Sequence, residues 1–236
     1  MKNNATFASS VLHFQSKLNL ADKLPVGVKA MNPFREGQVL ALSDVFLRKF
    51  YDDKHDRVLV LGINPGRFGS GLTGVAFTDP FALQEFCGIP NKLSKTRESS
   101  ATFIYQMIAA YGGVREFCDD FYLGATCPLG FLKDGVNYNF YDDPQLQNVV
   151  TPFIVNSVRK HVAFGGINEI AIVLGSGKLK KFWKKLNAEH KLFKSIVYLE
   201  HPRYIMQYKR RELSRFIVKY KKALLESREY LHNGRR

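Results

Sequence analysis

The sequence predicts an α/β fold, a three-layer α/β/α sandwich with a short, mostly parallel central sheet. Four short apolar runs rich in β-branched residues recur along the chain, as buried strands do. Amphipathic helical patterns separate them, and strands that alternate with helices indicate a parallel sheet covered on both faces. The 236 residues contain no repeat, low-complexity tract or clear linker. We therefore expect one domain over residues 1–236, with residues 1–30 forming an N-terminal extension that includes a helix.

The expected strands and helices follow from local patterns. The strands are residues 57–63 (RVLVLGI), 121–126 (FYLGAT), 169–175 (EIAIVLG) and 195–201 (SIVYLEH). Three helical faces are marked by apolar residues at helical spacing: Phe103, Ile104, Met107, Ile108 and Tyr111; Leu179, Phe182, Trp183 and Leu186; and Leu213, Phe216, Ile217, Tyr220 and Leu224.

Functional loops of a parallel sheet lie beyond the carboxyl ends of its strands. This rule selects the four loops after Gly62, Thr126, Gly175 and Leu199, which read INPGRFGSG, CPLGF, SGKLKK and EHPRYIMQYKRR. Each contains Gly, Pro, His or a basic cluster. The coincidence of four such loops at one edge of the sheet indicates a functional site there.

The charge predicts a polyanionic partner. The formal net charge is +14 and the isoelectric point is about 9.7, which favours nucleic acid first and an anionic membrane surface second. A basic surface without a function is the alternative. Three cysteines without a CxxC pair argue against a disulfide framework or a zinc or iron–sulfur site. Without a secretory signal or a spanning apolar run, we expect a cytoplasmic protein in a reducing compartment.

The first loop is suited to holding a ligand. The Asn64 amide donates and accepts hydrogen bonds but takes no proton at neutral pH, so a catalytic Asn64 would position a water or substrate. Pro65 fixes the backbone after it, and the glycines around it allow main chain to approach a ligand. Phe77 offers a stacking surface for a planar base. The alternatives are an Asn that caps a turn and a Phe of the core.

The third and fourth loops carry candidate phosphate and DNA contacts. Ser176, Gly177 and Lys178 open a helix whose free N–H groups suit a phosphate, although most lysines that follow are expected on a solvated helix face. His201 is either a buried core residue or a donor that stabilises charge. After it comes an apolar tip with basic residues, which suits a wedge in a base stack: Arg203, Tyr204, Ile205, Met206, Lys209, Arg210 and Arg211. An ordinary basic helix start is the alternative.

At this point the residues carry a resemblance to a known family. GINPGRFGSGLTGVAF resembles motif 1 of the single-strand-selective monofunctional uracil-DNA glycosylases, a branch of the uracil-DNA glycosylase superfamily. CPLGF, VLGSGKL, HPR and MNPF (residues 31–34) also fit, and the chain looks like a divergent bacterial-type member. The resemblance implies a DNA glycosylase of base excision repair, which flips a damaged nucleotide out of the stack and hydrolyses its N-glycosidic bond.

The resemblance also implies roles for single residues. Asn64 would position the attacking water, Phe77 would stack on the base, and His201 would stabilise the leaving base. The base would be wrapped by Gly62, Ile63, Pro65, Gly66, Phe68, Gly74, Phe77 and Ala125. DNA is the expected partner of a monomer acting at the bacterial nucleoid, and no metal or organic cofactor is implied.

The sequence departs from the family pattern at Ala125, where the family has the Asn that reads the uracil edge. A pocket without this filter would admit xanthine or hypoxanthine as well as uracil. The segment after His201 is also shorter than in the family. Two alternatives stay open: a mismatch-specific uracil/thymine glycosylase, which lacks the His that His201 matches, and a non-catalytic DNA-binding protein on the same fold.

Overall fold

The structure is a computed structural model and describes residues 5–233, so the ends of the predicted domain, residues 1–4 and 234–236, lie outside the described residues. Four parallel strands form the central sheet in the order β3-β2-β6-β7. They are β2 (Arg57–Gly62), β3 (Phe121–Ala125), β6 (Gly166–Leu174) and β7 (Ser195–Leu199). All four predicted strands are present, and the predicted α/β fold with a parallel central sheet is confirmed.

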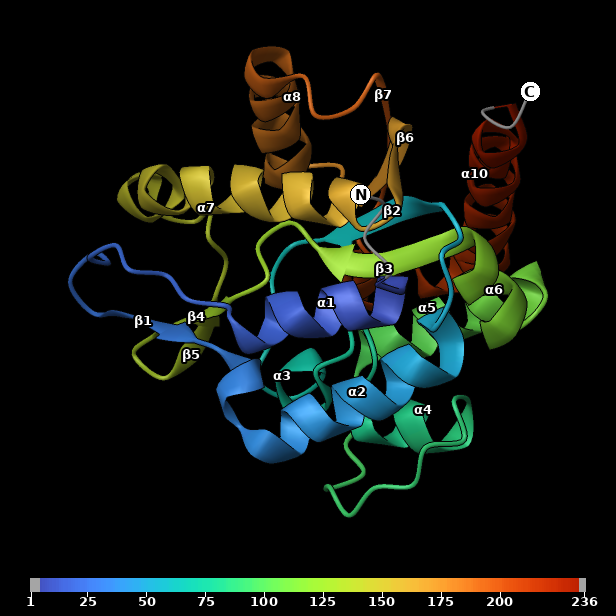
Figure 1. Cartoon of the computed structure of the whole chain (residues 1–236), viewed down its shortest axis with the longest axis horizontal. Helices are drawn as coiled ribbons and strands as arrows, with labels where there is room; N and C mark the ends of the chain where they lie inside the picture. Colours follow the sequence, from blue (N-terminus) through green and yellow to red (C-terminus); the bar gives the residue numbers. More distant parts are fainter. Residues whose placement is uncertain (1–4, 234–236) are drawn as a thin grey trace.

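Helices flank this sheet. Figure 1 shows α7 and α8 on one side of it and α2, α4 and α5 on the other. The helix α10 packs against β2 and β6 as well as α5. The helices are α1 (Phe7–Ser16), α2 (Gly37–Tyr51), α3 (Ser70–Thr73), α4 (Pro80–Glu85), α5 (Ser99–Tyr111), α6 (Val114–Asp120), α7 (Pro144–Ala163), α8 (Lys178–His190), α9 (Pro202–Tyr208) and α10 (Leu213–Asn233), with 3-10 turns at η1 (Pro33–Arg35) and η2 (Arg210–Glu212).

A second, antiparallel sheet was not predicted. It has the order β1-β4-β5, formed by β1 (Val28–Met31), β4 (Gly130–Lys133) and β5 (Val136–Tyr138). The loop between β4 and β5 consists of Asp134 and Gly135 alone, both with positive φ (51° and 72°), as a tight hairpin turn requires. This sheet brings the segment after β5 to the carboxyl ends of the parallel strands.

The N-terminal helix α1 is part of the core. Thr6 caps it through its hydroxyl, which accepts a hydrogen bond from the Ser9 N–H at 3.2 Å, and the side chains of Phe7, Ala8 and Val11 are buried. The helix packs along α2. The segment predicted as an N-terminal extension therefore contributes structure to the domain interior.

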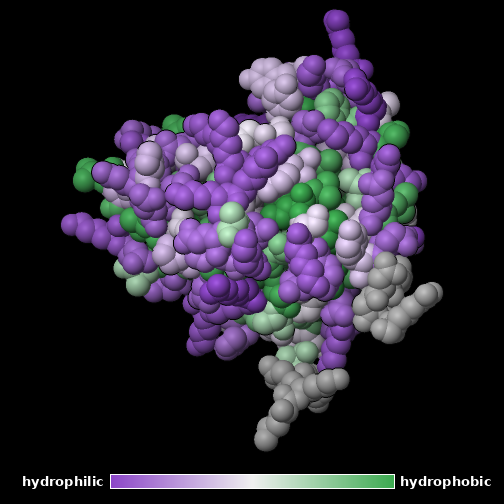
Figure 2. Space-filling model, turned by 90° about the horizontal axis from the view of Figure 1, so that it is seen from above, coloured by the Kyte–Doolittle hydropathy of each residue, from purple (hydrophilic) through white to green (hydrophobic). Residues whose placement is uncertain are grey.

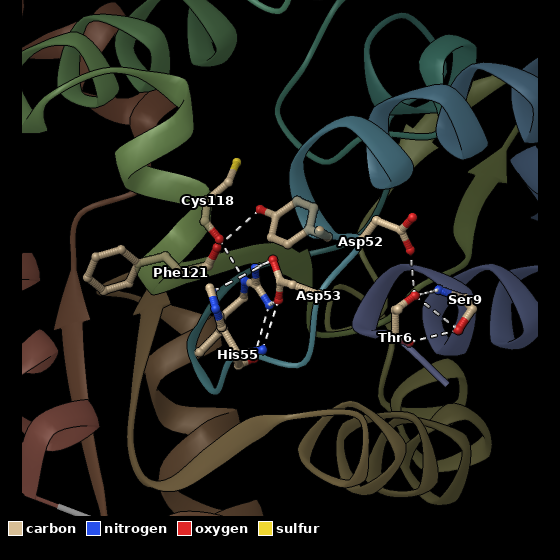
Figure 3. A network of polar contacts seen from close by, with 9 residues as sticks. Thr6, Ser9, Asp52, Asp53, His55, Cys118 and Phe121 are labelled. Atoms are coloured by element: carbon tan, nitrogen blue, oxygen red, sulfur yellow. Dashed lines mark hydrogen bonds and ion pairs between the residues drawn. The ribbon is translucent and has the colours of Figure 1, made fainter. Parts of the chain in front are cut away.

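A buried arginine ties α1, α2 and the central sheet together. Arg57 at the start of β2 has no exposed surface and makes a two-pronged pair with Asp53, with nitrogen–oxygen distances of 2.9 and 2.7 Å. It also donates to the carbonyl oxygens of Cys118 and His55 and lies over the rings of Phe7 and Tyr51. Figure 3 shows this network where Asp53, His55 and Cys118 converge.

The first prediction concerns Asp53. Burial pushes the pKa of this carboxyl up, but the hydrogen bonds from Arg57 and from the His55 N–H outweigh it and lower the pKa below the ordinary value. Asp53→Asn leaves the buried Arg57 charge without its counter-charge, so the free energy of unfolding should fall by about 3 kcal/mol. Urea unfolding at neutral pH measures this loss.

The same pair predicts a pH dependence. A carboxyl with a depressed folded-state pKa contributes stability that is present above its unfolded pKa of about 3.9 and is lost as the pH falls through the folded-state pKa. In the Asp53→Asn variant, the fall in unfolding free energy at low pH should be smaller by the part that protonation of Asp53 causes. The control is Asp52→Asn at the neighbouring exposed carboxylate, which accepts a hydrogen bond from the half-buried Thr6 hydroxyl at 2.7 Å. Equal effects of the two substitutions would contradict the assignment.

Candidate active site

A cavity of about 740 Å³ lies at the carboxyl ends of the parallel strands. The loops after β2, β3 and β7 line it, together with the segment before α5. Among the predicted site residues, these line the cavity: Gly62, Ile63, Asn64, Pro65, Gly66, Phe68, Gly74, Phe77, Ala125, His201 and Arg203. The residues predicted to bind the base and both candidate catalytic residues therefore line one cavity.

Asn64 is held by the segment that follows β5. Its Nδ2 donates to the Tyr138 carbonyl oxygen at 3.3 Å and to the Pro65 carbonyl oxygen at 3.4 Å. Its Oδ1 accepts from the Phe140 N–H at 3.3 Å. These contacts fix which end of the amide carries the oxygen. A carbonyl oxygen has two lone pairs, so Oδ1 keeps one that can accept from a water in the cavity.

Phe77 is fixed by its close approach to Gly62. A Cβ at Gly62 would lie 2.5 Å from the edge of the Phe77 ring, a distance that non-bonded atoms do not tolerate. Phe77 also has a φ of 54°, in the left-handed region that costs a bulky residue energy and persists only where the surroundings enforce it. The half-buried ring lines the cavity and is held there against the end of β2.

His201 caps the helix α9 and is neutral. Its Nδ1 accepts a hydrogen bond from the Arg203 N–H at 3.1 Å, so the ring proton resides on Nε2. Burial, and then the positive charge of Arg203, lower the pKa of His201 to about 4. The ring centre lies 5.7 Å from that of Phe77. The side chain is therefore a neutral hydrogen-bond donor on the wall of the cavity.

The predicted DNA wedge needs a correction at Ile205. This side chain has no exposed surface, because α9 turns Ile205 toward the domain interior and packs against α5. The exposed aromatic residues of α9 are Tyr204 and Tyr208, whose ring centres are 5.4 Å apart. Met206 is half-buried. The exposed side chains that could form the predicted wedge on α9 are therefore aromatic and do not include Ile205.

The predicted basic residues lie outside the cavity, apart from Arg203. Lys209 pairs with Glu212 at 3.0 Å, whereas Arg210 and Arg211 are exposed. Ser176, Gly177 and Lys178 are exposed at the start of α8, and none of them lines the cavity. Lys178 forms an ion pair with Asp142 at 3.2 Å.

Several cavity residues were not predicted. Burial, and then the Asp79 carboxylate, raise the pKa of Glu98, while Arg203 lowers it. Asn137 accepts from the Arg67 N–H at 3.2 Å, and Gln15 also lines the cavity. The sequence did offer a signal for Asn137, which matches an asparagine of the resembled family in the loop after CPLGF but was given no role, whereas Glu98 and Gln15 lie far from any recognisable motif.

One group of metal-ligand type occurs among residues 5–233. Ligand atoms of Asp53, His55 and Asp119 lie within 4.8 Å of one another, away from the cavity. The Arg57 guanidinium already pairs with Asp53 there. All three cysteines are buried and free, and no described helix is long and apolar enough to cross a membrane.

Comparison with known proteins identifies the family. Residues 48–225, most of the chain, match the family described as the uracil DNA glycosylase superfamily. The chain belongs to this superfamily. The crystal structure of wild-type SMUG2 from Pedobacter heparinus matches with a TM-score of 0.92 and 43% sequence identity, over 95% of this chain and 99% of that one. No curated protein sequence matches the chain significantly.

Membership confirms the predicted resemblance and the class of enzyme. The uracil-DNA glycosylase described here is a monofunctional hydrolase of the N-glycosidic bond, and its reaction belongs to base excision repair. Its substrate is a base in DNA. The cavity at the sheet edge is the space in which the residues of motif 1 and the HPR segment meet.

The second prediction follows from the state of His201. A histidine with an ordinary pKa near 6.5 would titrate near neutrality, whereas His201, with a pKa of about 4, should not. Single-turnover base excision should therefore show no inflection near pH 6.5. His201→Gln keeps a neutral donor and should cost about tenfold, and His201→Ala on the order of 10²–10³-fold. A step near pH 6.5 that disappears in His201→Gln would contradict the neutral donor.

Proposed function

We propose that the enzyme hydrolyses the glycosidic bond of flipped-out deaminated bases, with uracil, xanthine and hypoxanthine as the substrate class. The observation that carries the proposal is the shared cavity, into which one loop supplies a water-positioning amide and another a neutral imidazole donor. The Phe77 ring, whose centre lies 5.7 Å from that of His201, supplies a stacking surface for a planar base.

Asn64 suits a reaction in which the glycosidic bond breaks largely before water attacks. Such a reaction needs little base strength, because the sugar cation that forms reacts with water readily. The enzyme must then place the water rather than deprotonate it. Asn64 does this with the free lone pair of an oxygen whose position is set by Phe140 and Tyr138. A carboxylate is not required.

His201 suits the other half of the reaction. The departing base takes the electron pair of the glycosidic bond, and its carbonyl oxygen becomes negative. The Nε2–H of His201 donates to that oxygen, and donors fixed in advance where charge develops are the most effective stabilisers of a transition state. The Arg203 N–H fixes the imidazole, so this donor is preorganised.

The breadth of the substrate class is argued from Ala125. Its side chain lines the cavity but offers neither donor nor acceptor. A site that hydrogen-bonds its substrate rejects analogues lacking the right groups by about 10⁴-fold, whereas a site that relies on shape discriminates far less. A methyl group at this position therefore favours acceptance of more than one deaminated base.

Two alternatives differ in what they require. A mismatch-specific uracil/thymine glycosylase would remove thymine opposite guanine, and a non-catalytic DNA-binding protein would not use Asn64 or His201 at all. The placement of His201 beside Phe77 favours the proposed reaction over both. Oligonucleotides carrying uracil, xanthine, hypoxanthine or a G·T mismatch, treated with alkali after incubation, separate the three possibilities.

DNA contacts are proposed at α9 and η2. Tyr204 and Tyr208 form an exposed aromatic pair, and Arg210 and Arg211 follow as exposed cations. Aromatic rings stack on bases, and arginines bind phosphates. The face of the molecule in Figure 2 is largely hydrophilic, with a central area of apolar residues. Ser176, Gly177 and Lys178 at the start of α8 remain a second candidate phosphate contact.

The third prediction tests the role of Asn64. Asn64→Ala should lower the single-turnover excision rate on the order of 10²–10³-fold, because the water loses its acceptor. Binding to the same DNA should change less than threefold. The control is Asn148→Ala on α7, an exposed asparagine outside the cavity, which should leave both quantities unchanged. A normal excision rate for Asn64→Ala would refute the assignment.

The fourth prediction tests the proposed DNA contact. Replacing Lys209, Arg210 and Arg211 together by Ala should weaken binding to all sequences and reduce the slope of log K against log salt by about 1.5–2, equivalent to two phosphate contacts. Two rather than three contacts are expected because Lys209 is paired with Glu212. The charge-matched control replaces Lys181, Lys184 and Lys185 on α8. If the salt slope changes only in the control variant, the phosphate contacts lie on α8 instead.

A further inference from the structure

The wall of the cavity carries a single carboxyl group. Glu98, the residue before α5, is the only acidic residue that lines the cavity in the described part of the chain. The protein has a net charge of +14, and its substrate is a polyanion. A carboxylate at this place repels phosphates and loses part of its hydration, because Glu98 is half-buried. Its presence in the site therefore needs a reason.

The start of α5 does not supply that reason. A carboxylate before a helix can accept hydrogen bonds from the first free N–H groups of the helix, but the side chain of Glu98 makes no such bond. No group within residues 5–233 donates a hydrogen bond to its carboxylate oxygens or forms an ion pair with them. These oxygens remain open to the cavity.

Two contacts tie Glu98 to the loop after β2. Its carboxylate lies against Gly69, where an added Cβ would be 2.2 Å from Oε2, and Gly69 follows Asn64 by five residues. The Glu98 N–H donates to Asp79 Oδ2 at 2.7 Å, and Asp79 follows Phe77 by two residues. Glu98 is therefore held beside the segment that carries the catalytic amide and the stacking ring.

The loop after β7 adds an electrostatic contact. The helix α9 packs on α5, and its Arg203 lines the same cavity as Glu98. Burial, and then the Asp79 carboxylate, raise the pKa of Glu98, whereas the positive charge of Arg203 favours the ionised form. The neighbouring Arg97 is a second cation on this wall. A poorly hydrated carboxylate is weakly screened, so its charge acts on whatever occupies the cavity.

The proposed reaction creates a cation inside this cavity. As the bond between C1′ and the base breaks, its electron pair leaves with the base, and positive charge develops on C1′ and O4′ of the sugar. Water then adds to C1′, and the proton that it releases neutralises the departed base. The amide of Asn64 and the neutral ring of His201 carry no negative charge that could balance the sugar cation.

We infer that Glu98, as an ionised carboxylate, is the counter-charge that stabilises the sugar cation across the cavity. Coulomb attraction decreases only with the first power of distance, so the carboxylate acts without touching the sugar. The sugar is the same in every DNA substrate, and the effect is therefore independent of the base. This inference rests on the proposed function and adds a residue outside the motifs of Asn64 and His201.

The test removes the charge and keeps the shape of the side chain. Glu98→Gln should lower the single-turnover excision rate about 10–100-fold, as expected for unit charges roughly 6–10 Å apart at an effective dielectric constant of about 20. The factor should be the same for every base that the native enzyme removes. Binding to the same DNA should not weaken, because one negative charge fewer faces the phosphates.

Two further variants separate charge from structure. Glu98→Asp keeps the carboxylate and should recover most of the rate that Glu98→Gln loses. The control is Glu85→Gln at the end of α4, an exposed carboxylate outside the cavity. It removes the same charge from the protein and should leave the excision rate unchanged.

A binding measurement tests the counter-charge without turnover. A DNA strand that carries a cationic pyrrolidine in place of one sugar imitates the sugar cation, and a strand with a neutral tetrahydrofuran is its uncharged match. The native enzyme should prefer the cationic strand. Glu98→Gln should reduce this preference about tenfold, whereas Glu85→Gln should leave it unchanged.

The possible outcomes are distinct. An unchanged excision rate in Glu98→Gln, or an undiminished preference for the cationic strand, would overturn the inference while the proposed function stands. Weaker DNA binding with equal losses in Glu98→Gln and Glu98→Asp would indicate a merely structural role and would also overturn it. Unequal losses among the excised bases would mean that Glu98 reads the base instead. Native enzyme that removes none of the tested bases would refute the proposed function, and the inference with it.

Discussion

The structure depends on how the ends of β2 and β3 are joined. Thr126 donates to the Gly62 carbonyl oxygen twice, through its hydroxyl at 2.7 Å and its N–H at 3.0 Å. Trp183 of α8 in turn donates to the Thr126 hydroxyl at 2.9 Å, and all of this is buried. Buried hydrogen bonds are costly to leave unmade, so the two loops that follow are held in one register and open onto one cavity.

The candidate site residues Asn64 and Phe77 are held in place by that junction. Asn64 follows Gly62 by two residues, and the antiparallel sheet attached through β4 returns Tyr138 and Phe140 to its side chain. Phe77 packs so closely on Gly62 that no larger residue fits there. The strain of its positive φ is thus sustained by the ordered strand end, as expected where a functional side chain must not relax.

Local patterns revealed most of the fold and the loops that line the candidate site. Buried parallel strands are continuous apolar runs, so each could be recognised alone, and their common direction placed Asn64, Ala125 and His201 at one edge before any contact was known. The Asp134–Gly135 hairpin turn was an available signal that the prediction overlooked. Ile205 was misplaced because an apolar residue in a basic segment fits either a helix face toward the core or an exposed tip. Only the packing of α9 on α5 separates the two.

Gln15 lay beyond prediction for a different reason. Its orientation in the cavity wall is set by a contact with Ser43, 28 residues away, on a helix pair whose packing no short motif encodes. Both residues also precede the segment 48–225 that matches the superfamily. The candidate catalytic residues Asn64 and His201 sit at the shared sheet edge, whereas α1 and α2 add residues such as Gln15 and Ser43 to the wall of the same cavity. Substitutions in those two helices therefore alter the shape of the cavity wall without touching the loops that carry Asn64 and His201.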